Sequence, residues 1–144
     1  MTQEIKIYEQ MLGKVFTKVY RENCMNIHRW SDYHKKYFPH VVNSDVIVFE
    51  NDEEAFYFYH DYECCESVNI DDIVGELSLL ENSPILVAEE FTQCPDMPGL
   101  DSITYTFYKF ATVKGHVDIK WYGESNGFYS ESVDFSHYVK ELPL

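Results

Sequence analysis

One short stretch of the chain, residues 56–68, gathers the side chains best suited to chemistry. An aromatic segment leads to His60, and the adjacent Cys64 and Cys65 follow among several carboxylates. Imidazole and thiolate are ligands that zinc prefers, and a metal bound where a strand becomes a loop would hold that loop in place. The sequence therefore predicts a structural zinc site. The fourth ligand must come from elsewhere, and we select Glu90 from a wider set of candidates: Cys94, Glu89, His116, His137, Asp61 and Glu63.

Other interpretations of this stretch stay open. Side chains of neighbouring residues in extended backbone point to opposite sides, so only a turn at Cys64 and Cys65 would direct both thiols at one metal. Either cysteine could instead belong to the core, and His60 could be a hydrogen-bonded residue at a strand end. Under oxidation the two cysteines could form a strained disulfide.

Catalysis is disfavoured on two grounds. The carboxylates around Cys64 and Cys65 oppose formation of a nucleophilic thiolate. The chain also contains no G-x-S-x-G, H-E-x-x-H or P-loop motif. We therefore expect a protein that is not an enzyme.

The charge of the chain is large and unevenly distributed. The net charge is −14 over 144 residues. Residues 1–50 hold seven basic and six acidic residues, whereas residues 51–144 hold four lysines and nineteen acids. Such a charge argues against binding to nucleic-acid phosphates and to anionic membranes. It favours an acidic surface that docks on a basic partner, with simple solubility as the alternative. The residues predicted for that surface are Asp52, Glu53, Glu54, Asp71, Asp72 and Glu76.

The length and the pattern of the sequence predict a single domain of the α+β class, residues 1–144. We expect an antiparallel meander of about six or seven strands with one or two short helices. The strands are expected at 14–20, 45–50, 55–60, 85–91, 102–113, 117–122 and 129–136, and the strands at 45–50 and 55–60 should form a hairpin with a four-residue loop. Helices are expected at 2–12, 31–38 and, most clearly, 69–80, where Asp71 or Asp72 would cap the first turn.

The sequence also predicts a cytosolic location. The first twelve residues lack the pattern of a secretion signal, and no apolar stretch approaches the roughly 20 residues of a membrane span. In a reducing cytosol, thiols are more often metal ligands or core residues than disulfides.

Several blocks between residues 45 and 136 carry a family resemblance. They are His60, residues 64–68 (CCESV), Asp72-Ile73, Gly75, Pro84-Ile85, residues 88–90 (AEE), residues 104–109 (TYTFYK) and residues 121–133 (WYGESNGFYSESV). In this order they resemble a family of small phage-encoded domains of unknown function. Tyr105 stands where tryptophan is expected, and Phe128 where tyrosine is expected. Residues 1–44 match poorly and look like a variable N-terminal part beside a family-like core at 45–136.

The resemblance implies a phage or prophage origin and no established enzyme activity. Some similar phage proteins are anti-CRISPR proteins that act on the single-protein, RNA-guided nuclease of type II systems. We therefore predict a phage anti-defence protein in the host cytoplasm that binds and inhibits a CRISPR effector nuclease through its acidic surface, without direct contact to nucleic acid or membrane. The alternatives are a small-ligand binder that sequesters a nucleotide defence signal and a metal-dependent hydrolase.

Overall fold

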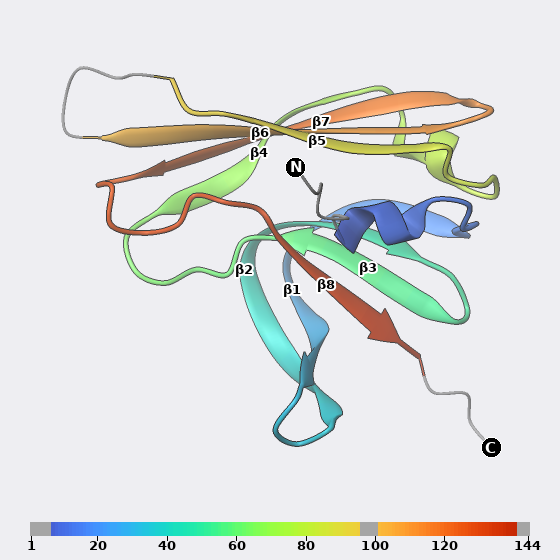
Figure 1. Ribbon diagram of the computed structural model, residues 1–144, viewed down its shortest axis with the longest axis horizontal. Helices are drawn as coiled ribbons and strands as arrows, with labels where there is room; N and C mark the ends of the chain where they lie inside the picture. The colour runs from blue at the N-terminus through green and yellow to red at the C-terminus, as the bar shows by residue number, and fades with distance from the viewer. Residues whose placement is uncertain (1–6, 96–100, 141–144) are drawn as a thin grey trace, which may run out of the picture.

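Two antiparallel sheets of four strands each face one another in the computed structural model, which describes residues 7–95 and 101–140 (Figure 1). The first sheet has the strand order β1-β2-β3-β8, and the second has the order β4-β7-β6-β5. The strands are β1 (Lys18–Ser31), β2 (Lys36–Glu50), β3 (Glu54–Tyr59), β4 (Ser67–Val74), β5 (Val87–Gln93), β6 (Ser102–Thr112), β7 (Gly115–Ser125) and β8 (Asp134–Val139). Two 3-10 helices, η1 (Ile7–Met11) and η2 (Leu77–Leu80), complete the described elements.

The main core lies between the two sheets and is rich in aromatic rings. Strand residues alternate between the two faces of a sheet, so every second residue of β2, β3, β6 and β7 points inward. The rings of Phe49 and Phe110 have centroids 4.9 Å apart, as do those of Phe58 and Tyr108. Trp121 is 1% exposed and completes the layer. Aromatic pairs of this kind bind the two sheets to one another.

A second, smaller core covers the outer face of the first sheet. The long β1–β2 hairpin has a bulge between Asn23 and Met25, where Cys24 adopts a positive φ of 62°. Beyond this bulge the hairpin buries Ile27 and Val42 in one cluster with the outward-facing residues of β2 and β3. A bulge increases the bend and twist of a strand, which allows the hairpin to pack on its own sheet. The outward-facing partners in this cluster are Val46, Val48, Ala55, Tyr57 and Tyr59.

The predicted α+β class is wrong, because the described residues contain eight strands and no α-helix. The clearest predicted helix, 69–80, is instead strand β4 followed by η2. Val68 and Ile70 face the core at a spacing of two, and β4 pairs with β7 from Ser67 to Val74. Gly75, with a φ of +102°, then turns the chain out of the strand. Ile73, Leu77 and Leu80 are spaced by four and three residues, which is typical of a helix. Ile73 belongs to β4, however, and the two leucines belong to η2.

Neither of the other two predicted helices is an α-helix in the described residues. Residues 31–38 form the tip of the β1–β2 hairpin, in which Ser31 pairs with Lys36. Of the predicted helix at 2–12, the structure describes only the part that contains η1, and residues 1–6 lie outside the described residues. Aromatic residues near the hairpin tip meet edge to face across the two strands, with the ring centroids of Trp30 and Tyr37 5.0 Å apart. Cross-strand pairs of this kind favour a ribbon over a helix.

Most of the predicted strands are present with shifted ends. The hairpin of 45–50 and 55–60 is confirmed by the pairing of β2 with β3, with Glu50 opposite Ala55. The strands predicted at 85–91, 102–113 and 117–122 correspond to β5, β6 and β7. The last strand begins at Asp134 rather than at residue 129, because residues 126–133 form a loop. None of the described helices is both long and apolar enough to span a membrane.

Candidate functional site

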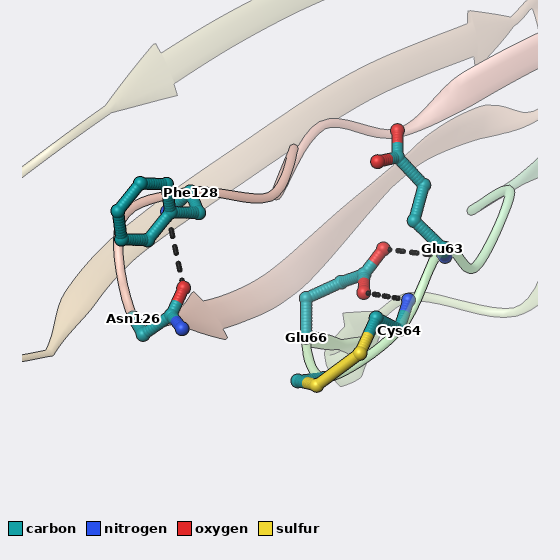
Figure 2. The surroundings of a disulfide bond; sticks show 6 residues. Glu63, Cys64, Glu66, Asn126 and Phe128 are labelled. Atoms are coloured by element: carbon teal, nitrogen blue, oxygen red, sulfur yellow. Dashed lines mark hydrogen bonds between the residues drawn. A yellow bond between two sulfur atoms is a disulfide. The ribbon is translucent and has the colours of Figure 1, made fainter.

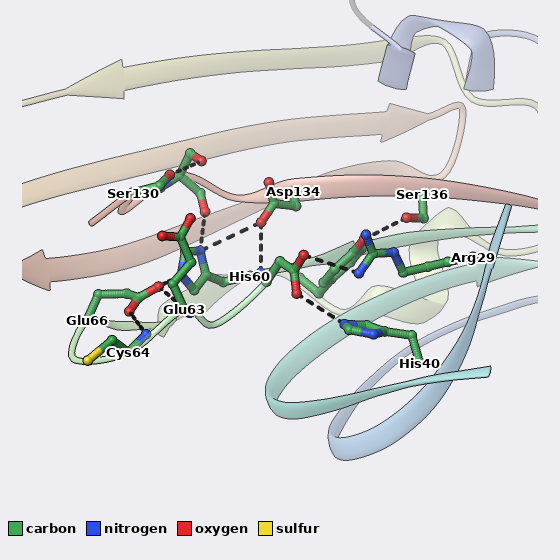
Figure 3. Close-up of polar contacts among 12 residues, drawn as sticks. Arg29, His40, His60, Glu63, Cys64, Glu66, Ser130, Asp134 and Ser136 are labelled. Atoms are coloured by element: carbon green, nitrogen blue, oxygen red, sulfur yellow. Dashed lines mark hydrogen bonds and ion pairs between the residues drawn. The ribbon is translucent and has the colours of Figure 1, made fainter. Parts of the chain in front are cut away.

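Two loops lie together at the end of the structure where β3 finishes. The first loop, residues 60–66, connects β3 to β4, and the second loop, residues 126–133, connects β7 to β8. They are neighbours because β8 pairs with β3, so that Tyr59 at the end of β3 lies opposite Asp134 at the start of β8. Figure 3 shows the polar contacts that join them.

A buried ion pair holds the first loop. Nε2 of His60 lies 2.7 Å from Oε2 of Glu66, and Nδ1 of His60 lies 2.7 Å from the carbonyl oxygen of Ser132. The side chains of His60 and Glu66 are 3% and 0% exposed. The pair therefore joins the first loop to the backbone of the second.

The carboxylate of Glu66 also organises the loop backbone. It accepts hydrogen bonds from the N–H groups of Glu63, at 2.9 Å, and Cys64, at 3.0 Å. Burial raises the pKa of Glu66, but the hydrogen bonds from the Cys64 N–H, the His60 ring and the Glu63 N–H outweigh it and lower the pKa to about 2. Glu66 is therefore ionised at neutral pH, and the loop is closed around its negative charge.

A second buried carboxylate, Glu131, holds the second loop. Its oxygens accept hydrogen bonds from the hydroxyls of Ser125, Thr104 and Ser102, the last two at 2.6 and 3.3 Å. Glu131 is 8% exposed and stands beside Gly123 in β7. The hydroxyl donors stabilise the buried carboxylate and tie the second loop to β6 and β7.

An aspartate pair connects the loops to the β1–β2 hairpin. Oδ2 of Asp134 accepts a hydrogen bond of 2.8 Å from the N–H of Asp61. The Asp61 carboxylate in turn lies 3.1 Å from Arg29 in β1 and 3.1 Å from His40 in β2. All three side chains are a third or more exposed, so these contacts orient the loops and contribute less energy than the buried pair of His60 and Glu66.

The outward surface of the two loops is acidic and carries exposed aromatic rings. Residues 61–66 and 124–134, which we call the acidic loop pair, contain six acidic residues and no lysine or arginine. Phe128 is 88% exposed and Tyr62 is 63% exposed. Figure 2 shows Phe128 and Asn126 in the surroundings of the Cys64–Cys65 bond. With Glu66 and Glu131 turned inward, the acids left for the surface are Asp61, Glu63, Glu124 and Asp134.

The residues predicted to bind zinc have other partners. Cys64 and Cys65 are joined to one another in a disulfide bond, and both ring nitrogens of His60 are hydrogen-bonded. Glu90 lies in β5 of the other sheet, where it accepts a hydrogen bond of 2.6 Å from the Tyr108 hydroxyl. No group of three or more His, Cys, Asp or Glu side chains within residues 7–95 and 101–140 is arranged to hold a metal ion. In this arrangement the donor set does not fit zinc, and zinc binding stays a prediction that requires free thiols.

Elemental analysis of reduced protein tests the zinc prediction. If a zinc site forms once the thiols are free, protein purified with reductant and zinc should hold about one equivalent of the metal. Cys64→Ser should then lose it, whereas the matched change Cys24→Ser, at an exposed free cysteine that is not a candidate ligand, should keep it. Zinc contents well below one equivalent, or equal in both variants, would contradict the prediction.

The predicted partner-binding acids do not form one cluster with the acidic loop pair. Asp52 and Glu53 lie in the β2–β3 turn, just before the start of β3, whereas the acidic loop pair lies beyond the end of that strand. Glu54 is 8% exposed and is bound by Lys14 at 2.9 Å and His137 at 2.8 Å. In β4, Asp71 pairs with Lys120 at 3.2 Å, and the neighbouring Asp72 is exposed. Glu76 is exposed just before η2.

Sequence reasoning did not select the two buried carboxylates that shape the site. Glu66 was visible as part of the CCE block, and Glu131 as part of the serine-rich block 130–132. A useful signal was the position of each acid two residues before an apolar residue that enters the core or packs on it, Val68 for Glu66 and Val133 for Glu131. In extended backbone, residues two apart point to the same side, so such an acid faces inward and needs donors.

The fold and the site define an all-β, two-sheet protein whose two connected loops present an acidic, aromatic surface. The chain belongs to a family described as a domain of unknown function (DUF7448), which matches residues 9–135. This match includes β1 and β2 as well as the blocks from residue 45 onwards. No curated protein and no solved structure matches the chain.

Proposed function

We propose that this protein is a binding protein without catalytic activity, which docks the acidic loop pair on a basic surface of a partner protein. The observation that carries the proposal is the exposure of Phe128 and Tyr62 within a surface of carboxylates that contains no lysine or arginine. Aromatic side chains are common anchors at protein interfaces.

The two parts of this surface have different roles. Exposed carboxylates attract a basic partner over a distance and align it, which mainly raises the association rate. Once the partner is in contact, an aromatic side chain such as Phe128 fills a pocket and supplies much of the affinity. The hydrogen bonds to the buried carboxylates of Glu66 and Glu131 hold the two loops in shape before binding. Less conformational entropy is therefore lost on docking.

The resemblance to phage-encoded domains identifies the partner to test first. We propose that the chain is a phage anti-defence protein, which acts in the host cytoplasm by inhibiting a CRISPR effector nuclease of type II. Such nucleases hold their nucleic acids in positively charged channels, which a surface rich in carboxylates could block. The proposal requires no contact between this chain and nucleic acid.

A nucleotide-sequestering role receives less support from the surface of the second sheet. A hollow of about 730 Å³ lies over β4 to β7 and includes Lys109, Lys120 and two phenylalanines. A nucleotide would require these lysines for its phosphates. The same hollow is lined by four acidic residues, and carboxylates that outnumber the lysines repel a phosphate. These acids are Asp72, Glu89, Glu90 and Asp118.

Charge reversal at two places tests the docking surface. We expect Glu63→Lys with Glu124→Lys to weaken binding to a purified type II effector by at least about tenfold, because attraction becomes repulsion. The matched control, Asp52→Lys with Glu53→Lys, makes the same change in net charge at the opposite end of β3 and should have a much smaller effect. Binding measured by interferometry at low and high salt should also lose much of its salt dependence in the first variant.

Two results would contradict this assignment. An equal loss of affinity in both double variants would mean that only the total charge matters. An affinity unchanged by Phe128→Ala would remove the proposed aromatic anchor, since this residue is 88% exposed and its truncation leaves the fold intact.

A further inference from the structure

Strand β8 has one free edge. It lies at the end of the sheet order β1-β2-β3-β8, so that only β3 pairs with it among the described strands. An unpaired strand edge presents a row of N–H and C=O groups to its surroundings. Such an edge can accept a further strand from another chain.

The hydrogen-bond pattern shows which residues of β8 direct their backbone to this edge. The Lys140 N–H donates to the Glu53 carbonyl at 2.8 Å, immediately beyond the opposed pair of Glu54 and Val139. Opposed residues in an antiparallel ladder alternate between bonded and non-bonded pairs. Val139, His137 and Phe135 therefore direct their N–H and C=O groups away from β3. In agreement, the Val139 N–H donates to the Tyr37 hydroxyl at 3.0 Å.

The β1–β2 hairpin packs against the Tyr138 and Val139 end of β8, and a groove lies beside the other end of the strand. Its volume is about 380 Å³, and residues 134–137 of β8 line it together with Arg29 and Trp30 of β1, Tyr59 and Asp61. This volume is near the lower end of the range of ligand pockets, roughly 300–1,000 Å³. The backbone groups of Phe135 and His137 are spaced by two residues, which is also the repeat of an extended peptide.

The charged residues that line the groove favour a basic occupant. Asp61 and Asp134 both line it, with side chains 45% and 39% exposed. Arg29 is the one lysine or arginine in the lining, and it already bonds to Asp61. The remaining charge is negative, so an extended segment with lysine or arginine side chains fits better than an acidic one.

We infer that the free edge of β8 is a strand-addition site, which binds an extended, basic segment of a partner protein along Phe135 and His137. Backbone hydrogen bonds to Phe135 and His137 supply the pairing, and Asp61 and Asp134 receive the basic side chains. The inference rests on the proposed function for the basic character of the partner, but the groove itself is separate from the tip of the acidic loop pair at Phe128.

A short blocked peptide of alternating lysine and valine, added to the full chain, tests the inference. Trp30 lines the groove and is 49% exposed, whereas the second tryptophan, Trp121, is 1% exposed, so a change in fluorescence on binding reports mainly on Trp30. We expect saturable binding. Methylation of alternate backbone nitrogens of the peptide, which removes donors to the edge, should weaken binding by about tenfold or more.

A matched pair of variants tests whether the charge of the groove matters. Asp134→Asn should weaken peptide binding several-fold, whereas the matched change Asp118→Asn, on the outer face of the other sheet, should leave it unchanged. Binding that is insensitive to backbone methylation, equal loss in both variants, or equal binding of a glutamate–valine peptide would overturn the inference. Because the assay contains no effector, a failure here leaves the docking proposal standing, and failure of the docking assay leaves this one standing.

Discussion

Glu66→Gln should lower the free energy of unfolding by about 3 kcal/mol, since removal of one partner from a buried ion pair typically costs 3–5 kcal/mol. The amide would pair less strongly with the buried His60 ring and would accept the Glu63 and Cys64 N–H groups less strongly. For a chain of 144 residues this corresponds to a fall in the melting temperature of roughly 6–12 °C. Urea unfolding at neutral pH followed by tryptophan fluorescence measures the change.

The matched control is Glu63→Gln, the same chemical change three residues earlier on an exposed side chain. The Glu63 backbone N–H still reaches Glu66 in this variant, so we expect a change within about 0.5 kcal/mol. If the two variants lose the same stability, the buried pair is not what holds the loop.

The pH dependence of stability offers a second readout of the same pair. The pKa of Glu66 in the folded protein is about 2, below its ordinary value of 4.5. A carboxylate with a lowered pKa stabilises the fold above its unfolded pKa, and this stabilisation is lost as the pH falls through the folded pKa. The wild-type chain should therefore lose about 3 kcal/mol between about pH 5 and about pH 2 through this group alone, and Glu66→Gln should lack that part. Glu54, whose pKa is also lowered despite burial by bonds from Lys14 and His137, supplies a remaining acid dependence in both.

Gly123→Ala should also destabilise the protein, by about 3 kcal/mol, through a steric conflict behind the second loop. A Cβ atom at this position would lie 2.7 Å from the Glu131 carbonyl oxygen and 2.9 Å from the Glu131 Cβ. Neither atom can move without shifting the backbone that presents the Glu131 carboxylate to its three hydroxyl donors. Overpacking of this kind typically costs about 1–3 kcal/mol. We expect Gly123→Ala at the upper end of this range, because it also disturbs the hydrogen bonds of the buried Glu131 carboxylate.

Gly127→Ala provides the comparison for this prediction. Nothing lies within 4 Å of a Cβ there, but the residue has a φ of +94°. The expected cost is about 1 kcal/mol, from backbone strain alone. Thermal unfolding of both variants checks the order. A larger loss in Gly127→Ala would mean that the turn geometry, rather than the contact with Glu131, dominates this loop.

The strands could be predicted from the sequence where alternation and turn chemistry agreed. The segment 45–60 showed two apolar runs around a four-residue polar turn, and it forms the β2–β3 hairpin. The same reasoning failed at 69–80 because Ile70 and Ile73 belong to a strand with a register shift, while Leu77 and Leu80 belong to η2. Two elements with different periods, joined at Gly75, produced an apparent period of about 3.6 residues. A bulge is set by the partner strand, which a single sequence does not reveal.

The candidate site could be located from the sequence but not interpreted. The unusual block around His60, Cys64 and Cys65 directed attention to this loop, and the zinc site predicted there stays a prediction. The partner of His60 in the structure is the Glu66 carboxylate, which was not among the predicted site residues. Whether an acid points outward or inward depends on the donors around it. The donor from the His60 ring is held in place by a second contact, to the Ser132 carbonyl oxygen of a distant segment. The pairing of β3 with β8 brings that segment into place.

The position of β3 between β2 and β8 also determines when the chain can finish folding. On one side β3 pairs with β2, which precedes it closely in the sequence, with Glu50 opposite Ala55. On the other side it pairs with β8, much later in the chain, with Glu54 opposite Val139. Contacts between residues so distant in sequence close late, because a long loop must lose its entropy before they form. A chain synthesised only as far as residue 133 would expose β3 as an edge. Without β8, the contact between His60 and the Ser132 carbonyl oxygen would not be held in place. The acidic loop pair and the groove beside it therefore form last, together with the final strand.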